Sequence, residues 1–286
     1  MAMDSGMSAF LKRSLEKGES IKCKFCGSKS TVKYGQYQGI RRYFCKDCKR
    51  KFADNDASPH MKTPASHVAS ALNLFYERKS ICAIRRHIEQ QFKNYPSNST
   101  IYRWVVRFTK VAIEKTKVCR LTTGRVWIAA ETPLKINGER WWIWDIIDSR
   151  TRFLLASHVL QVRTAQKAQM LMAQAAEKAS KFPRRVITNT LGAYLGSIQL
   201  AGLIIRSSKD MTEGVSKPLK YRIGIMQRVK KVKASRLLLD GCLVHYNFIK
   251  PHEDLNYRTP AEKARVNLPF SSWLSMVTEG SFSKHD

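Results

Sequence analysis

Apolar residues recur with helical spacing between positions 64 and 113, and this pattern predicts three short helices. They are expected over Pro64–Arg78, Ile81–Phe92 and Ser99–Ile113, where apolar side chains return every three or four residues. A polar stretch that contains a proline precedes the third helix. Ser97 or Asn98 in that stretch can accept hydrogen bonds from the first backbone amides of the helix and so define its start.

Three short helices with a polar turn before the third favour a helix-turn-helix unit. In such a unit the start of the third helix enters the major groove of DNA. This arrangement would place Ser99, Thr100 and Arg103 against the bases. The alternative is an ordinary three-helix spacer without a ligand.

The pattern changes after Gly124 to short apolar runs that are separated by turn residues, with one helix expected over Thr164–Ser180. The predicted strands are Val126–Ala129, Arg140–Ile147, Phe153–Val159, Arg185–Thr188 and Leu203–Ser207. Three sequential strands, a helix, a strand, a helical turn and a last strand predict an α/β fold. They are typical of a mixed-sheet core of the RNase H-like (integrase) type.

Four of the seven cysteines form two pairs with two residues inside each pair and eighteen residues between the pairs. The predicted zinc ligands are Cys23, Cys26, Cys45 and Cys48. This spacing is typical of a structural zinc site in which each pair occupies one tight turn. The residues between the pairs are β-prone, as a zinc ribbon requires. Two disulfides are the alternative, which a reducing compartment disfavours.

The charge of the chain indicates a polyanionic partner. Its 286 residues carry 51 Lys and Arg against 22 Asp and Glu, a net charge of +29. Contacts to phosphates release condensed counterions and so strengthen binding. The sequence has neither a secretory signal nor an apolar run long enough to span a membrane. We therefore expect a cytoplasmic, nucleoid-associated protein that binds double-stranded DNA and no membrane; a merely soluble basic protein is the alternative.

Several local sequences carry a resemblance to a known family. They are WIAAET at 127–132, WIWDIIDSRTR at 142–152, VITNT at 186–190, HYNFIKPHEDL at 245–255 and TPAE at 259–262. Together with the order of zinc ribbon, helix-turn-helix and α/β core, they resemble the DDE transposases of bacterial and archaeal insertion sequences. The resemblance extends over roughly Cys23 to Arg265, and the last two stretches are similar to the YNxxxPHxxL…TPAE element of that family.

The resemblance implies a catalytic centre in which three carboxylates hold two Mg²⁺ ions for DNA strand cleavage and transfer. The first family Asp position is Ala130 in this chain, the second is Asn189, and the family Glu falls best on Glu213. Two of the three expected ligands are therefore not carboxylates. The charge at the site falls from −3 to −1, which should weaken the binding of a hard dication severely.

Nearby acids offer an alternative source of ligands, as does a different alignment. Glu131 should point to the opposite face of the strand from Ala130, because side chains alternate along a strand. Asp148 is expected to cap a turn, and Asp145 lies on the neighbouring strand. The resemblance thus implies a transposase that binds transposon-end DNA but is impaired in catalysis. The alternatives are a domesticated or decayed DNA-binding protein or repressor, and a zinc-ribbon transcription factor whose α/β part serves for oligomerisation.

Basic side chains outside the three helices are expected to contact the DNA backbone. Arg41 and Arg42 lie in the predicted ribbon, and a run without acidic residues follows Gly214. The expected phosphate contacts of this run are Lys220, Arg222, Arg228, Lys230 and Lys231. A solvated helix face is the alternative. The resemblance further implies a homo-oligomer that holds the terminal inverted repeats and the target DNA.

The expected organisation has five parts. They are an N-terminal extension over 1–19, a zinc ribbon over 20–55, a helix-turn-helix domain over 61–118, an RNase H-like DDE core over 122–265 and a C-terminal tail over 266–286. His245 and His252, near the end of the core, are expected to make structural hydrogen bonds rather than to bind a metal.

Overall fold

A computed structural model describes residues 21–37, 40–55, 57, 61, 63–136, 138–188, 204–216, 219, 221–226, 232–268 and 270–279. The chain divides into two compact units, Met1–Ala65 with Ser281–Asp286, and Ser66–Gly280. Among the described helices, none is long and apolar enough to cross a membrane.

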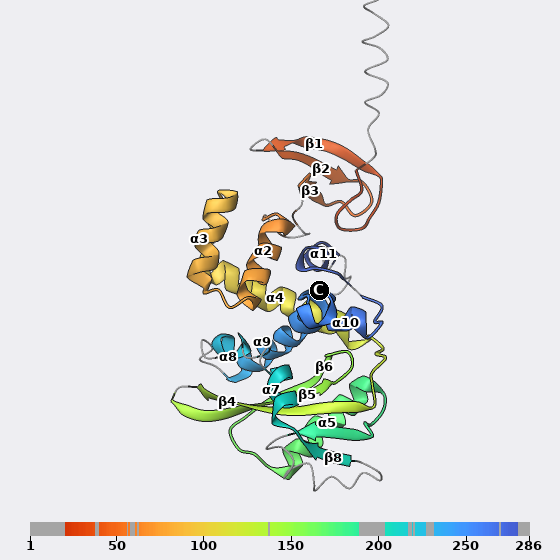
Figure 1. The fold of residues 1–286 in the computed structure, drawn as a ribbon. Coiled ribbons are helices and arrows are strands. Elements are labelled where there is room, and N and C mark those ends of the chain that lie inside the picture. The colour runs from red at the N-terminus through yellow and green to blue at the C-terminus, as the bar shows by residue number, and fades with distance from the viewer. Residues whose placement is uncertain are drawn as a thin grey trace, which may run out of the picture. The chain divides into compact units, whose positions relative to one another are not determined.

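The first unit contains a three-stranded antiparallel sheet (Figure 1). Its strands are β1 (Thr31–Tyr37), β2 (Ile40–Cys45) and β3 (Lys51–Ala53), in the order β1-β2-β3. The rings of Tyr43 and Phe52 stack 5.8 Å apart between centroids and form a small core together with the cysteines. The predicted hairpin between the two cysteine pairs is confirmed. A core of this size contributes little stability alone, which agrees with a dependence on metal.

The three predicted helices are present as α2 (Ala65–Tyr76), α3 (Ile81–Phe92) and α4 (Asn98–Lys117). The hydroxyls of Ser80 and Ser97 accept hydrogen bonds from backbone amides in the first turns of α3 and α4. These N-caps fix where both helices begin, as the sequence predicted for Ser97.

The second unit is built on a mixed five-stranded sheet. Its strands are β4 (Val126–Ile136), β5 (Glu139–Asp148), β6 (Leu154–Leu160), β7 (Arg185–Thr188) and β8 (Ile204–Ser207), in the order β6-β5-β4-β7-β8. The β4–β5 and β5–β6 pairs are antiparallel, whereas β7 is parallel to both β4 and β8. This topology, with the first strand in the centre, is that of the predicted RNase H-like core.

Strand β4 is longer than the sequence predicted, since it continues past Ala129 to Ile136. Its pairing with β7 ends at Ala129, whereas its pairing with β5 continues to the hairpin end. Among the described residues, Pro133 therefore has a paired strand on one side only, a position that tolerates the missing N–H. The hairpin closes between Ile136 and Glu139, and Gly138 has the positive φ of 85° that such a short turn favours.

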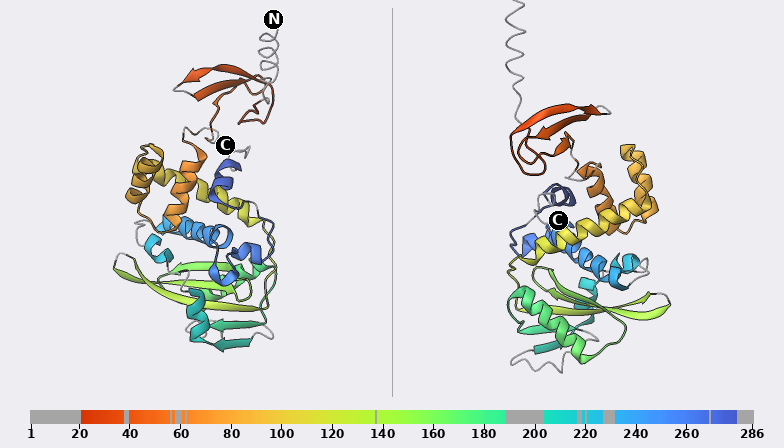
Figure 2. Two further views of the ribbon diagram at one scale, coloured as in Figure 1. Left: turned by 45° about the horizontal axis from the view of Figure 1, so that its top comes forward. Right: turned by 180° about the vertical axis from the view of Figure 1, so that it is seen from behind.

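Helices cover both faces of this sheet (Figure 2). Helix α5 (Ala165–Ala179) packs on one face against β5 and β6, whereas α7 (Lys209–Ser216) and α9 (Val232–Val244) pack on the other. The remaining short elements are α8 (Tyr221–Met226), the π-helix η2 (His245–Ile249), the 3-10 helix η3 (Glu253–Leu255), α10 (Pro260–Lys263) and α11 (Trp273–Glu279).

The three-helix segment α2–α4 is packed directly on the core through α4 and α9. The buried Tyr76 ring stacks on Trp273 of α11 at 5.3 Å, and its hydroxyl shares a 2.5 Å hydrogen bond with Thr109 of α4. Gly241 of α9 makes room for this contact, because a Cβ there would lie 2.0 Å from the Tyr76 Oη atom. The three helices and the core are therefore one packed body.

Candidate functional site

The four predicted zinc ligands converge in the first unit. Their Sγ atoms all lie within 4.8 Å of one another, and both the Cys23–Cys48 and the Cys26–Cys45 sulfur pairs are 3.6 Å apart. Four Zn–S bonds of about 2.3 Å in a tetrahedron require sulfur separations of about 3.8 Å, so the cluster has the size of a zinc site. A hydrogen bond from the Cys48 amide lowers the pKa of Cys45 to about 7, whereas burial raises the pKa of Cys48 to about 12.

The residues predicted to read DNA lie at the start of α4. Ser99 and Arg103 are exposed, and Thr100 is half-buried and accepts a 3.1 Å hydrogen bond from Arg103 Nη2. Trp104 and Val105 of the same helix are buried in the core. The polar residues therefore occupy the outer side of the helix start, as a recognition helix requires.

Ala130, the first of the family's acidic positions, lies inside an apolar cluster. Its side chain is 1% exposed and packs among residues of four strands and of the helices above the sheet. The cluster consists of Ile128, Ala130, Ile147, Leu154, Ile187, Leu219 and Tyr246. Glu213 lies on α7, which packs against β4, while Asn189 falls outside the described residues. No ligand atom for a metal is therefore present at Ala130.

Asp145 lies directly opposite Ala130 on β5 and is fully buried. Its carboxylate accepts two hydrogen bonds from Arg222, at 3.0 Å from Nη1 and 2.5 Å from Nη2. Arg222 Nη1 also donates to Ser157 Oγ at 3.0 Å, and its Nε donates to the Leu219 carbonyl at 3.0 Å. The guanidinium thus neutralises the carboxylate that β5 places directly opposite Ala130.

The prediction that Arg222 contacts DNA phosphate is therefore wrong. Its side chain is 1% exposed, because it pairs in the interior with Asp145 of β5. Lys220, Arg228, Lys230 and Lys231 lie outside the described residues. In the ribbon, Arg41 and Arg42 are exposed on β2, where phosphate can reach them.

The two other acids near Ala130 are also engaged. Glu131 accepts hydrogen bonds from Trp144 Nε1 at 2.7 Å and Arg163 Nη1 at 3.0 Å on the face that α5 covers. It thus points away from Ala130, as predicted. Asp148 accepts from the Gly124 amide at 2.9 Å and the Thr151 amide at 3.1 Å, which confirms its role in capping the turn.

The residues of the tail sequence between His245 and Glu262 have structural roles in this chain. Asn247 accepts from the Leu154 amide and donates to the Leu154 carbonyl, both at 2.9 Å, and so fixes the start of β6. His252 Nε2 lies 3.2 Å from the Tyr246 carbonyl oxygen. Thr259 and Glu262 form a reciprocal capping box at the start of α10.

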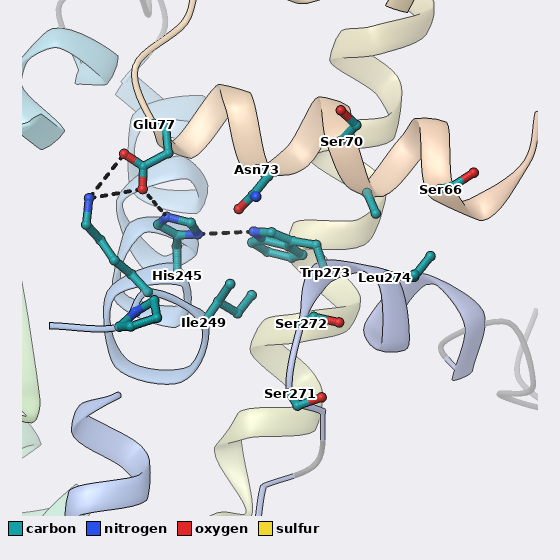
Figure 3. Close-up of a pocket in the computed structure, with 13 residues that line it drawn as sticks. Ser66, Ser70, Asn73, Glu77, His245, Ile249, Ser271, Ser272, Trp273 and Leu274 are labelled. Atoms are coloured by element: carbon teal, nitrogen blue, oxygen red, sulfur yellow. Dashed lines mark hydrogen bonds and ion pairs between the residues drawn. The ribbon is translucent and has the colours of Figure 1, made fainter. Parts of the chain in front are cut away.

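His245 joins the three-helix segment to the core, beside a pocket of about 570 Å³ (Figure 3). Its Nδ1 accepts from Trp273 Nε1 at 3.1 Å, and its Nε2 lies 3.2 Å from a carboxylate oxygen of Glu77. The hydrogen bond from His245, with the Lys250 ammonium, lowers the pKa of Glu77 to about 2, whereas burial lowers the pKa of His245. These contacts confirm the structural role that was predicted for both histidines.

Two features of the second unit were not predicted from the sequence. Helix α11 was not predicted, although its Trp273 is buried against Tyr76. The pairing of Asp145 with Arg222 was missed as well. An acid inside the apolar run of β5 was the available signal, because a buried carboxylate needs a partner.

Comparison with known proteins shows what the core is similar to. Residues 124–252, less than half of the chain, match the family described as a DDE domain. A protein of Halobacterium salinarum, described as an uncharacterized protein in transposable element ISH50, is 31% identical over 98 residues. That match spans 32% of this chain and 30% of the relative.

Two solved structures were found to be similar at low sequence identity. The HTLV-2 integrase catalytic core domain, solved in complex with magnesium, has a TM-score of 0.39 and 13% identity, with 51% of this chain and 97% of that chain covered. The simian T-cell lymphotropic virus intasome has a TM-score of 0.38 and 12% identity, with coverage of 68% and 72%.

Proposed function

We propose that this chain, whose core is a DDE transposase domain, binds transposon-end DNA but does not cleave it. The observation that carries the proposal is the state of the first acidic position. Ala130 is buried in an apolar cluster, and the carboxylates of Asp145, Glu131 and Asp148 are all engaged with other protein groups.

DNA binding is supported by the helix-turn-helix segment and by charge. The outer side of the start of α4 offers Ser99, Thr100 and Arg103 to a major groove, while Arg41 and Arg42 of the ribbon can contact phosphate. The net charge of +29 favours a nucleic-acid partner. We expect the ligands to be the terminal inverted repeats and target DNA, held by a homo-oligomer at the nucleoid.

The metal chemistry of the family does not fit the residues of this core. Paired Mg²⁺ ions activate the attacking oxygen and stabilise the leaving oxygen of a phosphoryl transfer, and they need several carboxylates. At the three family positions this chain has only Glu213 as an acid, since Ala130 has no ligand atom and Asn189 offers a neutral amide. We derive no catalytic step for this chain.

The cleavage test compares the natural chain with the Ala130→Asp, Asn189→Asp double variant on DNA that bears the ends of the element. Both proteins should bind the duplex, and only the double variant should nick and join strands with Mg²⁺ or Mn²⁺. A rise in melting temperature with Mn²⁺ in the double variant alone would show that its site has been restored. Robust metal-dependent turnover by the natural chain would refute the proposal.

The binding half of the proposal is tested separately by Arg103→Ala. This variant should lose affinity for the terminal sequence while its melting temperature stays unchanged, because the side chain is exposed. Loss of one base contact corresponds to about 1–3 kcal/mol, or roughly 5- to 150-fold in affinity. Unchanged affinity in this variant would mean that α4 does not read the DNA.

A further inference from the structure

The two faces of the zinc ribbon's sheet differ. The inner face packs on the small core around the cysteines, whereas the outer face exposes apolar and aromatic side chains. Tyr43 and Phe52 of the inner face are buried around the cysteines. The outer face exposes 48% of Tyr34, 38% of Val32 and 39% of Ile40. Exposed apolar side chains that gather on one face are typical of binding surfaces.

A β-bulge places Tyr34 on this outer face. Lys33 pairs with Tyr43 and Gly35 pairs with Arg42, so Tyr34 is the extra residue between two successive pairs. Gly35 has a φ of 125°, which few other residues adopt, and its missing side chain leaves open space with no atom within 4 Å of a Cβ position. Bulges commonly redirect a side chain at a functional surface. Here the bulge sets Tyr34 next to Gly35, where no side chain fills the space.

Cations flank this area and acids are absent from the strands. Lys51 of β3 lies across the sheet from Phe44, with its Nζ 3.9 Å from the centre of the Tyr34 ring and in contact with the Tyr34 hydroxyl. Arg42 lies opposite Gly35 and is exposed. The sequences of β1, β2 and β3 contain no Asp or Glu. The face thus combines an aromatic ring with positive charge.

We propose that this outer face, defined by Val32, Tyr34, Ile40, Arg42, Phe44 and Lys51, binds unpaired nucleotides of DNA. A base stacks on Tyr34 over the open space at Gly35, and the neighbouring phosphates contact Lys51 and Arg42. Aromatic rings with flanking cations are the means by which proteins hold single strands without reading their sequence, because every base has a π-face. Duplex bases are already stacked on one another and cannot use the ring.

The proposal goes beyond duplex binding by the helix-turn-helix segment, and the two can fail independently. The test measures binding of the full zinc-loaded chain to a fluorescent single strand of about 12 nucleotides and to a duplex of the element's end. Tyr34→Ala should weaken single-strand binding by about 5- to 150-fold, the equivalent of one stacked base. Tyr34→Phe should keep most of the affinity for the single strand. Lys51→Gln should make that affinity less dependent on salt concentration. Duplex-end affinity should be unchanged in all three.

Tyr257→Ala is the matched control, because Tyr257 is 75% exposed but lies on the other unit. This variant should bind both the single strand and the duplex end with unchanged affinity. Zinc content is measured for every variant, so that a misfolded ribbon is recognised. Single-strand affinity that is unchanged in Tyr34→Ala, or lost equally in Tyr34→Phe with zinc retained, would overturn the proposal. Equally strong competition by an acidic peptide would also overturn it, since that result would show a surface for acidic proteins.

Discussion

The buried Asp145–Arg222 pair provides the sharpest test of how the core is held together. Arg222→Met removes the guanidinium that donates hydrogen bonds to three buried groups. These are the Asp145 carboxylate, which is fully buried, the Ser157 hydroxyl and the Leu219 carbonyl. Removal of one partner from a buried pair costs about 3–5 kcal/mol, a large part of the roughly 5–15 kcal/mol that keeps a domain folded. For a unit of this size the melting temperature should fall by roughly 6–20 °C.

The assay is denaturant unfolding of the full chain, with a double-mutant cycle. Adding Asp145→Leu to Arg222→Met should recover much of the lost stability, because the unpaired charge is removed along with its partner. Arg85→Met is the matched control, since Arg85 pairs with Glu89 one turn along α3 and is 46% exposed, and such a surface pair is worth less than about 1 kcal/mol. A loss below about 1 kcal/mol in Arg222→Met, or no recovery in the double variant, would refute the role of this pair.

Three further predictions concern the packing and the metal site. Gly241→Ala should lower the free energy of unfolding by about 1–3 kcal/mol in denaturant titrations, because its Cβ would collide with Tyr76, whereas Gly224→Ala, which meets only a flexible arginine, should have little effect. Equal losses in the two variants would contradict the close packing of the helices on the core. Cys45→Ser should release zinc, measured by elemental analysis, and unfold the ribbon while the second unit keeps its melting transition; retained stoichiometric zinc would argue against the four-sulfur site. Burial lowers the pKa of His245, so the unfolded state binds more protons below pH 6.5 and stability should fall as pH decreases from there. His245→Asn should make that decline shallower in unfolding titrations at each pH, and an identical slope would show that His245 does not contribute.

The sequence predicted the local features of this protein well. The start of α4 follows from the serine that caps it, and the cysteine cluster follows from the spacing of the cysteines. The turn at Asp148 follows from a carboxylate that accepts hydrogen bonds from nearby backbone amides. Each of these depends on residues close in the chain or on the fixed geometry of a metal site. Local chemistry is sufficient in such cases.

Features that depend on distant partners were not predictable in the same way. Arg222 belongs to a run of cations and therefore resembled a phosphate contact, but its true partner lies 77 residues earlier in the chain. Trp273 is a second example, because its contacts with Tyr76 and His245 join helix α11 to the core. The sequence around Trp273 has little periodic pattern that would predict a helix. Strand β4 continues past Pro133, where β5 is its one pairing neighbour in the described part of the chain. Tertiary contacts decided all three.

We expect the core of this chain to lack a paired-metal site. Calorimetric titration of the zinc-loaded chain with Mn²⁺, beside the Ala130→Asp, Asn189→Asp double variant, tests that expectation most directly. The natural chain should show no saturable binding in the core at millimolar metal, while the double variant should bind two ions. Two ions bound by the natural chain at submillimolar concentration would contradict the account.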